Sequence, residues 1–256
     1  MTIRRTAALL LPLLLAACAH GPSTDSDAAR WAKAGQLVLV TTADWDAPSG
    51  TLRYYERNGT GWTQVGDAFD VTVGRNGSAW GIGLHAARSD GPVKREGDGK
   101  APAGVFAIGT AFGYAPSATT GLDYQGMGIN DWCIDVPGSA YYNRIIDRSL
   151  VKAPDLDKSS EPMRRDHHVD GDQRYREGFV IEHNPEGNVA NGGSCIFAHL
   201  WKAPGEATAG CTAMAPERMA PLLAWLDARK RPVFVELPRA QYDALKTEWR
   251  LPEIKP

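Results

Sequence analysis

The chain has 256 residues, of which 43% are hydrophobic and 23% are charged, so it can form one large globular domain or two small ones. Its formal net charge of −2 gives no electrostatic basis for binding nucleic acid, and none is expected as a partner. The 27 glycines and 17 prolines favour turns and short strands over long helices.

The N-terminal end of the chain looks like a secretion signal. Arg4 and Arg5 precede residues 6–17, which carry no charge and are mostly apolar. This pattern is typical of a signal peptide, and the run is too short for a membrane-spanning helix, which needs roughly 20 residues. It ends in LAAC at Cys18, which resembles a bacterial lipobox, although a plain signal peptide with an incidental cysteine would look alike. We predict a signal peptide over residues 1–17 and lipidation of Cys18.

A lipid anchor would place the protein in the periplasm of a bacterium. Several acyl chains on one residue bind a membrane far more firmly than one. The small and polar residues after the anchor predict a flexible tether over residues 18–35, followed by a folded domain over residues 36–256. Ala19 lacks the acidic side chain that tends to mark inner-membrane retention in enteric lipoproteins. We therefore expect the outer membrane, contacted only through the anchor.

Three cysteines remain after Cys18. In an oxidising compartment three thiols suggest one disulfide and one free thiol. The sequence does not fix the pairing. We expect a disulfide between Cys133 and Cys195, which leaves Cys211 free and reactive.

Short strands follow one another in the first hundred residues. Asn58-Gly59 is a strong hairpin signal. Runs rich in β-branched and aromatic residues predict strands at residues 36–42, 51–57, 61–65 and 68–73. Strands at this spacing indicate a β-sandwich or barrel, and no parallel βαβ pattern is present.

A loop and a long irregular segment come next. Pro92–Gly109 begins as a charged loop, either a solvated turn or the border of a substrate cleft, and enters a strand at Val105. Residues 152–178 are polar without clear periodicity, which suggests a lid or a binding loop. His167 and His168 lie there, but adjacent residues cannot share one face of a strand or helix. We expect surface histidines and no metal site.

Two strands are predicted in the part of the chain that carries His199, at residues 179–183 and 194–199. Side chains alternate along a strand, so Cys195 and His199 share a face, but about 13 Å of strand separates them. Cys195 is therefore not the partner of His199. A helix here would bring the two together for metal binding, but the Pro/Gly loop that follows disfavours it. A helix from Pro216, a strand at 232–237 and a closing helix at 239–249 complete the prediction.

His199 and Cys211 have the residue types of a base and a nucleophile. A neighbouring histidine can lower the pKa of a thiol and accept its proton. Thr208-Ala209-Gly210 predicts a tight turn, and the Cys211 N–H with a neighbouring amide could form an oxyanion hole. Thr208 could donate a hydrogen bond there or cap the turn. A buried structural cysteine and a core histidine are the alternatives.

These residues resemble a family. His199, then Thr208-Ala209-Gly210-Cys211 and a helix, is similar to the catalytic segment of YkuD-type L,D-transpeptidases, which have a His, a spacer and then Ser/Thr-His-Gly-Cys. Residues 94–106 resemble the substrate-side loop of the family, as Tyr141-Tyr142-Asn143 does in one branch. The resemblance covers residues 37–237. It implies a mainly β, YkuD-like β-sandwich with a few helices and a long irregular insertion, as the catalytic domain over residues 36–256.

The resemblance also implies a reaction on peptidoglycan stem peptides. Cys211 would attack a carbonyl as the nucleophile, and His199 would accept and then donate the proton. Gly210 and Thr208 would form the oxyanion turn, with weaker substrate contacts expected from Tyr142, Asn143 and Lys100. A second amine would resolve the thioester and form a cross-link. No metal or organic cofactor is needed, and we expect a monomer.

Two departures from the family pattern leave alternatives open. Ala209 replaces the second His of the motif, and Ala213 stands where Arg or Asn often sits. Recognition of a substrate carboxylate could therefore differ. The same site could act as a hydrolase, an L,D-carboxypeptidase or an amidase. In a further alternative the protein is a non-catalytic lipoprotein that binds cell wall.

Overall fold

The computed structural model describes residues 27–254. The predicted signal peptide and Cys18 lie outside these residues. Within them, no helix has the length and hydrophobicity that crossing a membrane would require.

Strands make up most of the regular structure in the described residues. The helices are α1 (Asp27–Arg30), α2 (Arg165–His168), α3 (Pro216–Trp225) and α4 (Arg239–Leu245), with 3₁₀-helices at Leu156–Lys158, Pro185–Gly187 and Ala228–Lys230. The strands are β1 (Gln36–Thr42), β2 (Ser49–Asn58), β3 (Gly61–Thr72), β4 (Ser78–Trp80), β5 (Ala101–Gly113), β6 (Tyr124–Gly126), β7 (Asp131–Cys133), β8 (Ile145–Asp147), β9 (Glu161–Pro162), β10 (Glu177–Ile181), β11 (Phe197–Leu200), β12 (Thr212–Met214) and β13 (Val233–Pro238).

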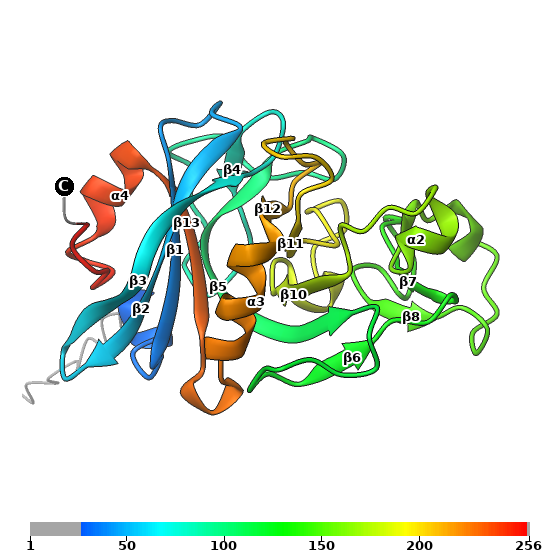
Figure 1. The fold of residues 1–256 in the computed structure, drawn as a ribbon. Helices are drawn as coiled ribbons and strands as arrows, with labels where there is room; N and C mark the ends of the chain where they lie inside the picture. The colour runs from blue at the N-terminus through cyan, green and yellow to red at the C-terminus, as the bar shows by residue number, and fades with distance from the viewer. Residues whose placement is uncertain (1–26, 255–256) are drawn as a thin grey trace, which may run out of the picture.

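The main sheet closes on itself. Its strands follow the order β10-β11-β12-β3-β2-β1-β13-β5-β4, with β6 beside β5, and β10 also pairs with β5. β1–β13, β11–β12, β4–β5 and β5–β6 are parallel, and the other pairs of this sheet are antiparallel. Figure 1 shows this sheet with α3 and α4 against different parts of it. The architecture confirms the predicted fold class, a mainly β, YkuD-like β-sandwich with few helices.

The β2–β3 hairpin is where the sequence predicted it. Gly59 has a positive φ of 57°, a conformation that favours glycine, and it makes the turn. The two strands predicted between residues 61 and 73 are a single strand, β3. A bulge explains the apparent break: Leu52 pairs with Phe69 but Tyr54 pairs with Val65, so one residue of β2 lies opposite three of β3.

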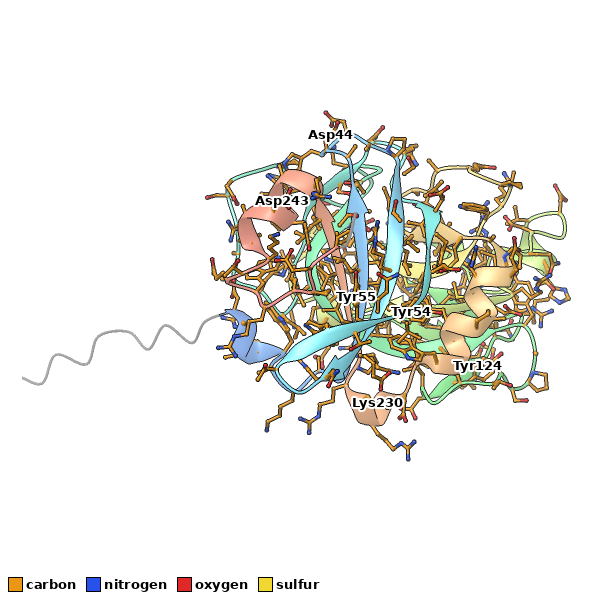
Figure 2. All side chains as sticks on the ribbon, turned by 60° about the vertical axis from the view of Figure 1, so that its left-hand side comes forward. Asp44, Tyr54, Tyr55, Tyr124, Lys230 and Asp243 are labelled. Carbon is orange, nitrogen blue, oxygen red and sulfur yellow. A yellow bond between two sulfur atoms is a disulfide. The ribbon has the colours of Figure 1, made fainter. Side chains whose placement is uncertain are left out.

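Alternating side chains give the sheet two buried faces. On β2, the neighbours Tyr54 and Tyr55 (Figure 2) point to opposite sides: Tyr54 packs on the inner core and Tyr55 belongs to the outer core. The inner core includes Val38, Val40, Phe234 and the α3 residues Met219, Leu222 and Leu223. The outer core includes Leu37, Leu39, Val235, Tyr242 and Trp249.

The folded domain includes part of the predicted tether. Ala28, Trp31 and Ala34 are buried in the outer core, and the ring of Trp31 meets that of Trp249 edge-on at 5.6 Å. The packed part of the chain therefore begins before residue 36, the predicted start of the domain. The small, polar composition of this segment gave no sign of the long-range contact.

The predicted irregular insertion, residues 115–178, contains a small sheet of its own with the order β8-β7-β9. Figure 1 shows it, in green, beside β10 and β11. It packs on the sheet through a third cluster, the insertion core: Phe112, Met127, Cys133, Met163, Tyr175, Cys195, Phe197 and Cys211. His167 and His168 are exposed on α2. No group of three His, Cys, Asp or Glu side chains in residues 27–254 could hold a metal ion.

The inner face of β13 carries a buried carboxyl group. Glu236 is fully buried and accepts hydrogen bonds from Ser78 Oγ at 2.7 Å and Thr212 Oγ1 at 3.2 Å. Burial raises its pKa from 4.5 to about 7, and the two hydroxyl hydrogen bonds oppose the rise. The folded protein therefore binds this proton more tightly than the unfolded chain does.

We predict that Glu236→Gln removes a pH-dependent loss of stability. As the pH rises from about 4.5 to about 7, the unfolded chain ionises Glu236 first, so the free energy of unfolding of the wild type falls by about 3 kcal/mol. The variant, which cannot ionise there, should lack this component. Denaturant unfolding at pH 5 and pH 8 measures it, with exposed Glu217→Gln as the control. Equal pH dependence in wild type and Glu236→Gln would show that the carboxyl group does not titrate in this range.

Candidate active site

His199 and Cys211 are positioned by two adjoining parallel strands. β11 pairs with β12 so that His199 lies opposite Ala213. Ala198 and Leu200 point into the inner core, and Phe197 and Cys211 belong to the insertion core on the other face. Strand alternation therefore places His199 and Cys211 on the face that the insertion covers.

The predicted strand at residues 194–199 begins only at Phe197. Cys195 has a positive φ of 55°, which is incompatible with an extended strand. Its sulfur forms the disulfide with Cys133, the pairing expected from the sequence. Cys211 is the free cysteine of the described residues.

The Cys211 thiol is held by backbone groups. The Phe197 N–H donates to Sγ at 3.4 Å, and Sγ donates to the Cys195 carbonyl at 3.5 Å. Cys211 is only 7% exposed, and burial raises its pKa from 9.0 to about 12, with a further rise from the charge of Glu161. The sequence predicted a thiol whose pKa a histidine lowers. For the free protein that prediction is wrong, because removal from water outweighs every favourable contact.

The His199 ring is fixed in one tautomer. Nδ1 lies 2.7 Å from the Leu200 carbonyl, which can only accept, so Nδ1 carries the proton and Nε2 is left as an acceptor. Burial lowers the His199 pKa from 6.5 to about 4, although the Leu200 hydrogen bond opposes this. The imidazole is therefore uncharged at neutral pH. The group that orients it, which the sequence could not identify, is the carbonyl of the next residue.

Thr208 caps the turn that leads to Cys211. Its Oγ1 accepts from the Gly210 N–H at 3.0 Å and donates to the Cys211 carbonyl at 2.6 Å. Gly210 has a positive φ of 152°, and a Cβ there would lie 2.9 Å from the Lys100 carbonyl oxygen. Of the two roles considered for Thr208, this geometry is that of a cap. Glycine is required at position 210 by both backbone conformation and space.

Tyr142 and Asn143 hold the loop before β11. Asn143 Oδ1 accepts from the Cys195 N–H at 2.7 Å, and Nδ2 donates to the carbonyls of His183 and Asn184, each at 2.8 Å. The Tyr142 hydroxyl donates to Glu96 at 2.5 Å. Both side chains were expected to contact substrate. In the free protein their polar groups are bound within the protein, and the substrate contact stays a prediction.

Lys100 was also expected at the substrate. Its Nζ donates to the Asn76 carbonyl at 2.5 Å and lies 3.4 Å from Asp46. These contacts tie the side chain to neighbouring loops in the free protein, and its contact with substrate stays a prediction. The backbone carbonyl of Lys100, against Gly210, is the part of this residue nearest the turn.

The insertion supplies side chains that the sequence did not single out. The Tyr175 ring meets the His199 ring edge-on at 5.2 Å, and its hydroxyl donates to Glu161 Oε1 at 2.8 Å. Arg165 pairs with the same carboxylate at 2.9 Å. In the sequence, these three residues stood out only because they lie in the polar segment, residues 152–178, predicted as a lid or binding loop. Tyr175 therefore packs against the His199 ring, and the Glu161–Arg165 pair holds the Tyr175 hydroxyl.

A groove lies next to this face. It has a volume of about 370 Å³, and Phe197, Cys133 and Asn143 are among its lining residues. Phe197 is the residue whose N–H contacts the Cys211 sulfur. The groove and Cys211 therefore share Phe197 as a neighbour.

Fold and site together define a mainly β domain that holds a buried cysteine and an uncharged histidine on one face of adjoining strands. The family model for the L,D-transpeptidase catalytic domain, YkuD, matches residues 41–235. The chain therefore belongs to this family, which gives it an L,D-transpeptidase-type function related to peptidoglycan. No curated protein and no solved structure matches the chain.

We predict that removing the disulfide loosens the site. It closes a span of 62 residues and joins the insertion to Cys195, whose carbonyl accepts from the Cys211 thiol. The chain-entropy model assigns such a loop about 4 kcal/mol. Cys133→Ala combined with Cys195→Ala should lower the free energy of unfolding by this order and speed alkylation of Cys211. Unchanged stability and alkylation would contradict a supporting role.

The raised pKa predicts how the Cys211 thiol reacts in the free protein. Iodoacetamide should modify it more slowly than free cysteine at pH 7, and the rate should still rise at pH 10, because little thiolate exists below a pKa of about 12. His199→Ala should keep this pH profile. A rate that levels off below pH 8 would mean that the resting thiol is already ionised.

Proposed function

We propose that the protein is a periplasmic, lipid-anchored cysteine peptidyltransferase that remodels or cross-links peptidoglycan stem peptides through a Cys211 thioester. The observation that supports this most is the uncharged His199, whose Nε2 is left as a base on the strand face that also carries Cys211. A thiol and an unprotonated imidazole nitrogen are the groups that covalent acyl transfer requires. Family membership supports peptidoglycan as the substrate.

The proposed reaction has two halves. Cys211 Sγ attacks a peptide carbonyl carbon while His199 Nε2 takes the thiol proton, and the C–N bond then breaks as the imidazolium protonates the departing amine. A second amine attacks the thioester, His199 accepts its proton, and the thiolate leaves and is reprotonated. The Leu200 carbonyl, hydrogen-bonded to Nδ1, would stabilise the imidazolium in both halves.

Proton transfer is part of the attack in this proposal. With the Cys211 pKa near 12 and the His199 pKa near 4, a resting thiolate–imidazolium pair is disfavoured. The charges would form only when a substrate carbonyl is present to take up the new bond. Such a site avoids a reactive thiolate between turnovers.

The oxyanion would be stabilised by backbone N–H groups of the turn. We assign this role to the Cys211 N–H and a neighbouring amide. The Gly210 N–H already donates to Thr208 Oγ1 at 3.0 Å in the free protein. It would become available only if the substrate oxygen replaced the hydroxyl.

The proposed location is the periplasmic face of the outer membrane, through lipidated Cys18. The disulfide between Cys133 and Cys195 supports an oxidising compartment. Labelling with a radioactive fatty acid, with Cys18→Ala as the negative control, tests the anchor. Full labelling of that variant would contradict lipidation at Cys18.

Hydrolysis is a second candidate for the same pair. Cys211 and His199 are 7% and 4% exposed, and such burial favours a small acceptor such as water. A hydrolase would release shortened stem peptides and form no cross-links. Product analysis separates it from transfer.

We predict that purified protein incubated with defined disaccharide-peptides forms a covalent adduct at Cys211 and then cross-linked products, both read by mass spectrometry. Cys211→Ala should abolish both, because it removes the nucleophile. His199→Gln should slow adduct formation by about 10²- to 10⁴-fold, the usual contribution of a general base.

His168→Gln is the matched control, since His168 is exposed and its ring contacts the Ile129 carbonyl. It should leave the rate unchanged. Shortened stems without cross-links would favour the hydrolase. If wild type formed no adduct and Cys211→Ser left every cell-wall phenotype intact, the non-catalytic alternative would replace the proposal.

A further inference from the structure

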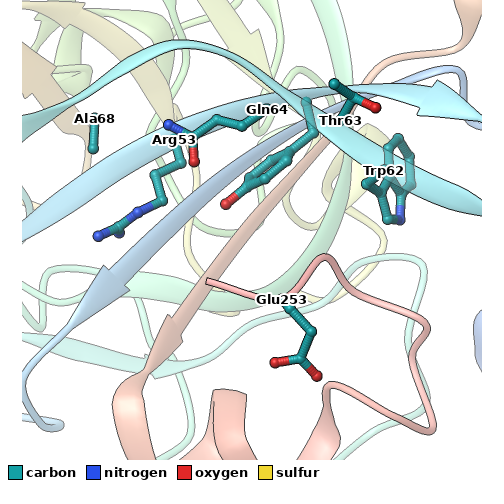
Figure 3. Close-up of a pocket in the computed structure, with 7 residues that line it drawn as sticks. Arg53, Trp62, Thr63, Gln64, Ala68 and Glu253 are labelled. Carbon is teal, nitrogen blue, oxygen red and sulfur yellow. The ribbon is translucent and has the colours of Figure 1, made fainter. Parts of the chain in front are cut away.

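We propose that the protein has a second binding site, a saccharide-binding pocket on the outer face of β2 and β3. This outer pocket has a volume of about 560 Å³, within the usual range for small-molecule sites. Figure 3 shows Arg53, Gln64 and Trp62 on the strands and Glu253 across from them on the C-terminal segment. Its lining residues are Arg53, Tyr55, Trp62, Thr63, Gln64, Ala68 and Glu253.

The hydroxyl of Tyr55 is the strongest sign of a missing ligand. Tyr55 lines the outer pocket and is only 2% exposed, yet its hydroxyl has no hydrogen-bond partner among the described residues. Buried polar groups without partners are rare in folded proteins. Burial also raises the Tyr55 pKa to about 12, so the group keeps its proton and can both donate and accept.

Arg53 is a second polar group of the outer pocket, and it has few partners within the protein. It forms no ion pair with any described residue, and its one hydrogen bond is a long contact of 3.5 Å to Thr41 Oγ1. The β3 bulge lies opposite Arg53, between the pairs Leu52–Phe69 and Tyr54–Val65. Bulges of this kind re-aim side chains next to functional sites.

The donors and acceptors of the outer pocket suit a neutral polyol. Arg53 can only donate, Glu253 as a carboxylate can only accept, and Gln64 and Tyr55 can do both. Glu253 would repel an anion and Arg53 would repel a cation. The hydroxyls of a neutral sugar can form hydrogen bonds with all four side chains. Glu253 pairs with Lys246 through Oε2 at 2.8 Å, which leaves its other oxygen as an acceptor.

Trp62 adds a fixed aromatic ring at the edge of the outer pocket. Its Nε1 donates to the Arg250 carbonyl at 2.9 Å, and the Arg57 guanidinium lies 3.8 Å from the ring centre. The ring is thereby immobilised before a ligand arrives. An aromatic surface beside several hydrogen-bonding groups matches a sugar, which has apolar C–H groups as well as hydroxyls.

The outer pocket lies on the same face of the sheet as Cys211. Ala68, Asp70 and Thr72 alternate onto one face of β3, and Thr72 pairs with Ala213, two residues from Cys211. Ala68 and Thr72 are about 13 Å apart along the strand. A glycan held in the outer pocket could therefore extend toward the Cys211 face with its peptides attached. This link to glycan-borne stem peptides rests on the proposed function, whereas the binding site itself does not.

Titration calorimetry with the β-1,4-linked tetramer of N-acetylglucosamine tests the outer pocket. We expect saturable binding to the wild-type chain. Tyr55→Phe should weaken it by about 3- to 10-fold, the usual value of one neutral hydrogen bond, and Arg53→Gln should weaken it at least as much. Tyr55→Phe removes no hydrogen bond within the described residues, so it should fold normally.

Tyr54→Phe is the matched control, because Tyr54 is the next residue but packs on the inner side, with its ring 4.9 Å from that of Trp225. It should bind the tetramer like wild type. Absence of saturable binding, or equal affinity in wild type, Tyr55→Phe and Arg53→Gln, would overturn the inference. If the tetramer binds but the disaccharide-peptides form no covalent adduct at Cys211, the proposed function alone is overturned. If the disaccharide-peptides form the adduct but the tetramer does not bind, the outer pocket alone is overturned.

Discussion

The hydrogen bond between His199 Nδ1 and the Leu200 carbonyl is the interaction on which the candidate site depends. It sets the tautomer, turns Nε2 into a base and is the contact that would stabilise a positive ring. Burial acts in the same direction, because it disfavours the charged forms of both His199 and Cys211. In the free protein both groups are therefore uncharged. In the proposed reaction the thiol proton moves to His199 only as Cys211 attacks the substrate.

The rest of the fold keeps His199 and Cys211 buried. Strand alternation directs Ala198 and Leu200 into the inner core and turns the opposite face toward the insertion. The insertion is held there by the Cys133–Cys195 disulfide and by Asn143, which binds the Cys195 N–H. Excluding water strengthens electrostatic interactions at the site. Excluding water also raises the pKa of the Cys211 thiol. Burial therefore protects the thiol from side reactions but also disfavours the thiolate that attacks the substrate.

The sequence was sufficient for features that depend on local pattern. β1 follows from its β-branched run and the hairpin from Asn58-Gly59, whereas the catalytic pairing of Cys211 with His199 stays a prediction. The long-range disulfide between Cys133 and Cys195 was expected, but other features depend on contacts that only the fold creates. The thiol pKa depends on burial and on Glu161, fifty residues away, and Tyr142 and Asn143 bind loops that only the fold brings near. Trp31 lay in a segment of small and polar residues, and only its packing on Trp249 makes it part of the domain.

The state of His199 is the most direct test of this account. Nitrogen-15 NMR of the ring reports both the tautomer and the pKa. We predict a proton on Nδ1, none on Nε2, and titration well below the usual 6.5, near 4. A proton on Nε2 at pH 7, or titration at 6.5 or above, would contradict the central claim that the free protein holds an uncharged pair with Nε2 as the base.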